Sequence, residues 1–188
     1  MKYLPRIFPK IEFILAVDPA LSTGIALFQV YRNSDNGMLR KIVPVATETI
    51  QSYLLKPYSE VFSELKRTYG LNENNLYLAI ETWTYARNLK TVLGLGKAQQ
   101  RVFDALEVVG CLPAKNCIQL VNANKWQAAV LGHNHNTKKW SLQFAVLLYP
   151  DVEDVTEDVA DAVGIGHYTF MELVNSQRGY MAKRKRSK

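Results

Sequence analysis

Short apolar runs alternate with helix-like patterns along this chain. The runs have the length and composition of buried strands, and they lie at residues 12–18, 25–31, 39–47, 76–81 and 117–121. Asn and Gly within residues 33–37 predict a hairpin after the second run, and Pro44 assigns the third strand to a sheet edge. The pattern therefore predicts that the chain opens with three antiparallel strands.

Apolar residues at three- and four-residue spacing predict helices in the remainder of the chain. One helix follows Pro57 and ends at Gly70, and a long one covers residues 91–109 before Gly110. Further helices are predicted at 122–131, 137–149 and 158–174. The order of elements indicates an α/β fold with a five-stranded mixed sheet, three antiparallel strands and then two parallel ones, and helices on both faces.

Composition limits the class of protein. The 188 residues are 48% apolar and 21% charged, which suits one folded domain and excludes a disordered or fibrous chain. Charges at Arg6, Lys10 and Glu12 exclude a secretory signal, and no apolar run is long enough for a membrane helix. With only Cys111 and Cys117, we expect reduced thiols and a cytoplasmic location, nucleoid-associated in a bacterium or in the host cytoplasm for a virus.

The net charge of +6 comes mainly from the C-terminal end. Five of the 23 basic residues lie in residues 183–188, which leaves 18 basic residues against 17 acidic ones in the rest of the chain. We therefore predict a folded domain over residues 1–176 and a basic tail over 177–188. A tail of this kind is either a solvated end or an arm that attracts nucleic-acid phosphates.

Four acidic residues occur in settings that do not favour a charge. Asp18 and Glu81 each end a run that otherwise reads as a core strand, and clefts at strand ends are where α/β proteins bind ligands. Asp158 and Asp161 are three residues apart on the last predicted helix, so they share a face and repel each other. We therefore expect a positive partner among the four.

The chemistry of these side chains indicates which partner that is. Carboxylates alone form an all-oxygen site, which suits Mg²⁺ or Mn²⁺ and does not suit zinc. Two such ions per site can activate a water molecule and stabilise the leaving oxygen during attack at phosphorus. The four acids thus point to metal-dependent phosphodiester hydrolysis.

Four segments resemble the RuvC family of Holliday junction resolvases. ILAVDPALSTGIALF is similar to its first motif, AIETWTYARNLKTVLGLGKAQ to its second, and VNANKWQAAVLG followed by EDVADAVGIGHY to the segments that complete it. The resemblance implies an RNase H-like nuclease domain, a homodimer, and paired symmetric nicks in a four-way DNA junction. By position it assigns the metal ligands to Asp18, Glu81, Asp158 and Asp161.

The chain departs from the family pattern at two places. Ala20 stands where the family usually has Gly after the Asp-Pro pair, and residues 97–101 lack the Gly of an Ala-Arg-Gly turn. These differences bear on the preferred cleavage sequence and on dimer geometry more than on the metal chemistry.

Further residues are candidates for contacts with DNA. Lys138 and Lys139 lie in the region where resolvases place a lysine that neutralises the scissile phosphate, and two solvated lysines are the alternative interpretation. The segment after Glu81 carries aromatic and cationic side chains that can stack on bases or hold the backbone, or else pack in the fold. These predicted DNA-binding residues are Trp83, Tyr85, Arg87, Asn88 and Lys90.

The histidines and two other functions offer alternative interpretations. GHNHN at residues 132–136 reads as an exposed loop, and His167 as a core or surface residue. The alternatives are a nuclease for RNA or RNA/DNA hybrids and a non-catalytic protein that binds branched DNA. DPALSTG also resembles the phosphate-binding turn of actin-like ATPases, but the chain is short for that fold and has no second glycine-rich phosphate loop.

Overall fold

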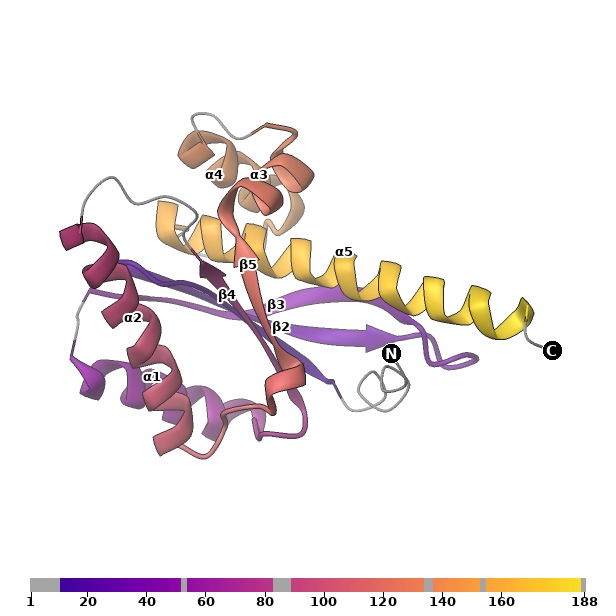
Figure 1. The fold of residues 1–188 in the computed structure, drawn as a ribbon, viewed down its shortest axis with the longest axis horizontal. Helices are drawn as coiled ribbons and strands as arrows, with labels where there is room; N and C mark the ends of the chain where they lie inside the picture. The colour runs from indigo at the N-terminus through magenta and orange to yellow at the C-terminus, as the bar shows by residue number, and fades with distance from the viewer. Residues whose placement is uncertain (1–10, 52–53, 83–88, 134–136, 153–154, 187–188) are drawn as a thin grey trace.

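A computed structural model describes residues 11–51, 54–82, 89–133, 137–152 and 155–186. Its centre is a five-stranded sheet in the order β3-β2-β1-β4-β5 (Figure 1). Strands β1, β2 and β3 pair antiparallel, whereas β4 and β5 join them in parallel, so the predicted mixed sheet is confirmed. The strands are β1 (Phe13–Asp18), β2 (Thr23–Arg32), β3 (Leu39–Ile50), β4 (Leu76–Thr82) and β5 (Ile118–Asn122).

Helices cover both faces of this sheet, as the sequence predicts (Figure 1). On one face lie α1 (Leu55–Tyr69) and α2 (Leu89–Val108), and Gly70 ends α1 in the left-handed conformation at φ 67°. On the other face lie α3 (Ala123–Leu131), α4 (Thr137–Leu148) and α5 (Glu157–Arg186). No helix among the described residues is both long and apolar enough to cross a membrane.

The two faces of β1 explain why its sequence is apolar at successive positions. Ile14 and Ala16 face one core with Trp126 and Val163 of α3 and α5. Leu15 and Val17 face the second core, which includes residues of α1 and α2 such as Phe62 and Leu106. Because neighbouring strand residues point to opposite faces, a strand covered on both sides must be apolar throughout.

Close contact between α5 and the sheet depends on Gly24 in β2. A Cβ atom at this position would lie 1.9 Å from the backbone oxygen of Asp158, which no packed structure tolerates. Gly24 also pairs with Asp18 across β2 and β1. The glycine therefore allows the first turn of α5 to lie directly over the end of β1.

Helix α5 extends well beyond the predicted end at residue 174. It continues to Arg186, and on the way the side chain of Gln177 accepts a hydrogen bond of 2.9 Å from the backbone N–H of Leu39. The predicted boundary at residue 177 thus falls inside one continuous helix (Figure 1).

Candidate functional site

Two of the predicted carboxylates lie at the C-terminal ends of neighbouring parallel strands. The parallel register of β1 and β4 pairs Val17 with Ile80, and the next residues along the two strands are Asp18 and Glu81. Both residues are partly buried. The structure therefore brings together two acids that are 63 positions apart in the sequence.

The other two carboxylates come from the first turns of α5. Thr156 caps this helix, since its hydroxyl accepts the N–H of Val159 at 3.2 Å. The same hydroxyl lies 3.2 Å from the Thr49 hydroxyl of β3, which ties the helix end to the sheet. Asp158 follows two residues after the cap, with its backbone against Gly24, and Asp161 lies one turn further along.

The pKa of Asp18 reflects its burial and the charges of the other three predicted ligands. It is raised well above the ordinary value, mainly because burial disfavours the charged form. The negative charges that raise it further are, in decreasing order, those of Glu81, Asp161 and Asp158. Lys138 acts in the opposite direction. Asp18 therefore interacts electrostatically with all three of the other predicted carboxylates.

Glu81 has a specific hydrogen-bond partner that the sequence did not reveal. The indole Nε1–H of Trp126 donates to its Oε2 at 2.6 Å. The pKa of Glu81 is raised to about 7, mainly by burial and also by the charge of Asp161, while the Trp126 hydrogen bond acts to lower it. The Glu81 carboxylate thus accepts from a neutral donor, Trp126, and interacts with a like-charged neighbour, Asp161.

Asp161 has one carboxylate oxygen without a hydrogen-bond partner among the described residues. Burial raises its pKa, while a hydrogen bond from Ser141 of α4 and the charge of Lys138 lower it. Its Oδ1 is buried and has no hydrogen-bond partner within the described ranges. A buried carboxylate oxygen in this state is costly, so the site suits a bound cation.

The two predicted lysines differ in position. Lys138 donates to Glu157 Oε2 at 2.7 Å, and this hydrogen bond, followed by the charges of Glu157, Asp158 and Asp161, raises its pKa despite some burial. Lys139 is exposed at the next position of α4. Lys138 therefore interacts with Glu157 by a hydrogen bond and with Asp158 and Asp161 through its charge.

The residues present fit a hard divalent cation in their chemistry. All four acids offer oxygen, the donor type that Mg²⁺ and Mn²⁺ prefer, and Asp161 Oδ1 is available. As they stand, no three His, Cys, Asp or Glu side chains in the described part of the chain form a ready group around one ion. It is the strand register and the packing of α5 on Gly24 that bring the carboxylates to one region, against their mutual repulsion.

Most of the predicted DNA-binding residues are not covered by the structure. Trp83, Tyr85, Arg87 and Asn88 lie outside the described residues, and so does the side chain of Lys90 in the first turn of α2. In the sequence these residues follow Glu81, and their contact with DNA stays a prediction.

Two histidines have local packing partners. His133 lies edge-on to Trp140, with ring centroids 5.2 Å apart. His167 Nδ1 lies 2.8 Å from the Tyr149 hydroxyl and packs against Phe144, and burial lowers its pKa. These contacts give His167 a place in the packing of α4 and α5.

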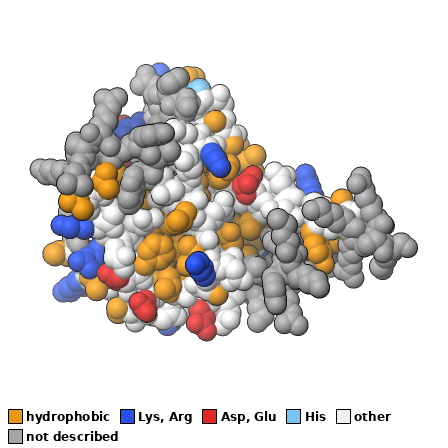
Figure 2. All heavy atoms as spheres, in the orientation of Figure 1, with side chains coloured by type: hydrophobic (Ala, Val, Ile, Leu, Met, Phe, Trp, Pro, Cys, Tyr) orange, Lys and Arg blue, Asp and Glu red, His pale blue; other side chains and the backbone are white. Residues whose placement is uncertain are grey.

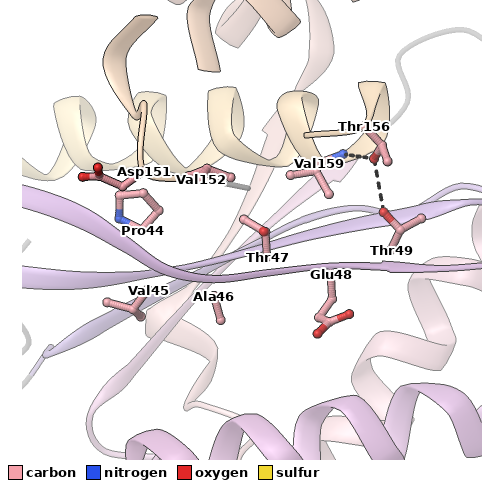
Figure 3. A pocket seen from close by; sticks show the side chains of 10 residues that line it. All are labelled: Pro44, Val45, Ala46, Thr47, Glu48, Thr49, Asp151, Val152, Thr156 and Val159. Carbon is pink, nitrogen blue, oxygen red and sulfur yellow. Dashed lines mark hydrogen bonds between the residues drawn. The ribbon is translucent and has the colours of Figure 1, made fainter. Parts of the chain in front are cut away.

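A separate cavity of about 620 Å³ opens beside β3. Figure 3 shows it between this edge strand and the segment that leads into α5. Its lining residues include Thr47, Thr49 and Thr156, whose side chains face one another in Figure 3, and none of the four predicted ligands. The cavity is therefore separate from the predicted carboxylate site.

Comparison with known proteins gives a consistent answer at the level of fold. No family model matches the chain, and no curated protein matches it. RuvC from Thermus thermophilus, solved in complex with a Holliday junction substrate, superposes with a TM-score of 0.64 at 15% identity. The match covers 87% of this chain and 96% of that protein.

Two further resolvases have similar structures. Fowlpox virus resolvase, solved with its substrate Holliday junction DNA, has a TM-score of 0.51 at 15% identity, covering 85% of this chain and 99% of that one. The yeast mitochondrial Holliday junction resolvase Ydc2 has a TM-score of 0.51 at 10% identity, covering 94% and 85%. The chain therefore has the RNase H-like fold of RuvC, with the strand order β3-β2-β1-β4-β5.

Proposed function

We propose that this protein is a divalent-metal-dependent, structure-selective DNA endonuclease that resolves four-way junctions by paired symmetric nicks. The observation that supports this most is that the charges of Glu81, Asp158 and Asp161 all act on Asp18, at the C-terminal end of β1 in a RuvC-like fold. Phosphodiester hydrolysis on oxygen-bound metal ions is the chemistry that such a group of acids suits.

In this proposal the four carboxylates hold two Mg²⁺ ions, for which Mn²⁺ substitutes. The bound ions would activate the attacking water and stabilise the leaving oxygen. The chain itself positions the ligands, because Trp126 and Ser141 hydrogen-bond Glu81 and Asp161. Lys138 adds a cation beside these acids, where it can stabilise the charge that develops on the phosphate.

The proposed partners are branched DNA and a second copy of this chain. Paired nicks in opposing strands require two active sites, and one chain supplies one group of carboxylates. Figure 2 shows hydrophobic side chains gathered near the centre of the face on which β5 lies in front. β5 is an edge strand, and its Leu120 is 59% exposed. Exposed apolar surface of this kind supports a protein contact.

Cleavage of a labelled mobile four-way junction tests the proposal directly. We expect paired nicks with Mg²⁺, none in chelator, and loss of nicking in Glu81→Gln. Glu73→Gln is the matched control, because Glu73 is exposed and precedes β4 whereas Glu81 is near its far end. It makes the same chemical change away from the site, and we expect normal nicking.

A substrate panel separates the alternatives. Flaps, linear duplexes and RNA/DNA hybrids are compared with the junction at equal concentration. Preference for a hybrid would replace the proposal with an RNase H-like activity. Junction binding without nicking, in the presence of either Mg²⁺ or Mn²⁺, would indicate a non-catalytic binding protein.

A further inference from the structure

Trp126 is a fully buried aromatic residue with a single polar atom. Its helix, α3, begins directly after β5, where the side chain of Asn122 caps the first turn by accepting the N–H of Lys125. β5 in turn pairs with β4 so that Val121 lies opposite Glu81. The start of α3 is therefore fixed beside Glu81 by sheet register and by its cap.

The indole ring is confined on its other side by α5. A Cβ atom at Gly164 would lie 2.5 Å from Trp126 Cζ3 and 3.0 Å from Cε3, so the ring occupies the space that a side chain at Gly164 would need. Trp126 is 0% exposed. Close packing of this kind limits the ring to one orientation, and the indole N–H then has one direction in which to donate.

That direction leads to one oxygen of Glu81. The 2.6 Å hydrogen bond uses Oε2 and leaves Oε1 without this donor. A buried N–H needs an acceptor, and a carboxylate that accepts from a fixed donor loses rotational freedom. Partners of this type orient ligands in metal sites and commonly change metal affinity by about 10- to 100-fold when removed.

We propose that Trp126 is a positioning residue that fixes the Glu81 carboxylate through Oε2 and keeps Oε1 for a divalent metal ion. This inference rests on the proposed function, because it assigns Glu81 to a metal site. It adds a residue of α3 to a site otherwise built from strand ends and α5.

Removing the N–H donor tests the proposal. Trp126→Phe keeps an aromatic ring, and Trp140→Phe, at the 47% exposed tryptophan of α4, is the matched control. We expect Mn²⁺ affinity, measured by electron paramagnetic resonance without DNA, to fall about tenfold in Trp126→Phe and to stay unchanged in the control. In junction cleavage, the Mg²⁺ concentration for half-maximal rate rises by a similar factor while the KM for DNA stays the same.

A purely structural role for Trp126 gives a different result. It would lower the melting temperature and leave Mn²⁺ affinity as in wild type, which would overturn the proposal. A second measurement does not use Trp126→Phe and therefore does not depend on the folding of that variant. The indole N–H resonance of Trp126 in metal-free protein should shift in Glu81→Gln, whereas that of Trp140 should not. No shift at Trp126 would also overturn the proposal.

These readouts separate the inference from the nuclease proposal. If Trp126→Phe binds Mn²⁺ more weakly than wild type and wild type cuts no DNA, the positioning role is supported and the nuclease function is contradicted. Junction cleavage with unchanged Mn²⁺ affinity in Trp126→Phe would do the reverse. A wild type that binds no Mn²⁺ would overturn both.

Discussion

Burial of the Glu81 carboxyl, with the added charge of Asp161, makes Glu81 affect stability in the absence of metal. Its pKa rises from 4.5 to about 7 on folding. The contribution to the free energy of unfolding is therefore complete below about pH 4.5 and is lost as the pH rises towards 7, at about 1.4 kcal/mol per pKa unit. We expect wild type to lose stability relative to Glu81→Gln across this interval.

Urea unfolding in chelator at several pH values between 4.5 and 7.5 measures this difference. Glu73→Gln controls for the loss of a glutamate elsewhere. Parallel stability curves for wild type and Glu81→Gln would show that the carboxylate is not perturbed. Saturating Mg²⁺ should stabilise wild type more at pH 7.5 than at pH 4.5, because protons and metal compete for the same oxygens.

The two neighbouring lysines of α4 are expected to differ in their effect on cleavage. Both side chains are exposed, and the charge of Lys138 interacts with Asp158 and Asp161. We expect Lys138→Gln to lower the rate of junction cleavage at least tenfold, since a preorganised charge is worth several kcal/mol in a transition state. Lys139→Gln should change it by less than about threefold, on the scale of a surface charge.

Single-turnover cleavage at saturating Mg²⁺ distinguishes the two variants. Both should fold like wild type, because an exposed ion pair such as Lys138 with Glu157 contributes at most about 1 kcal/mol. Equal losses in the two variants would assign the lysines a shared role in binding the DNA backbone instead.

At the scale of elements, the contact between α5 and β2 should limit both stability and activity. Gly24→Ala would place a methyl group 1.9 Å from the Asp158 backbone oxygen and push the helix away from the sheet. We expect a loss of about 1–3 kcal/mol in the free energy of unfolding, the usual cost of overpacking. Metal affinity should fall as well, because Asp158 and Asp161 move with the helix.

Gly179→Ala is the control on the same helix. A Cβ atom there meets nothing within 4 Å, so the change should be neutral or stabilising by up to about 1 kcal/mol through helix propensity. Chemical denaturation and Mn²⁺ titration of both variants provide the comparison. A wild-type Mn²⁺ affinity in Gly24→Ala would show that the position of α5 does not control the site.

Elements with a simple burial pattern were predictable from the sequence. β1 and β4 are covered on both faces, so their uninterrupted apolar runs marked them as strands and made Asp18 and Glu81 conspicuous at their ends. Pro44 correctly placed β3 at the sheet edge. Each of these signals depends on residues that are near each other in the sequence.

Contacts that depend on how elements cross could not be predicted in the same way. The sequence showed Trp126 only as an apolar residue of a short helix, because its partner Glu81 is 45 positions away and depends on the pairing of β4 with β5. The basic composition after residue 182 suggested a solvated end or a DNA-binding arm and gave no sign that α5 continues to Arg186. Periodicity reports which face is apolar and does not report what that face meets.

At the scale of the whole molecule, the charge at the end of α5 is expected to act on DNA without regard to its shape. Residues 183–188 supply five of the 23 basic residues, and the helix is anchored to β3 earlier, at Gln177. Deleting 183–188 should therefore leave the fold intact and weaken binding to junctions and duplexes alike. Each lost phosphate contact should reduce the slope of log affinity against log salt by about 0.9.

Binding to a junction and a linear duplex at several salt concentrations, with wild type and the truncated chain, tests this expectation. The loss of affinity should be equal for the two DNAs, since phosphate contacts carry no information on structure. An unchanged salt slope would show that the end of α5 does not touch DNA. A loss confined to the junction would show that these residues recognise its shape, and selectivity would then reside at the far end of α5 as well as at the carboxylates.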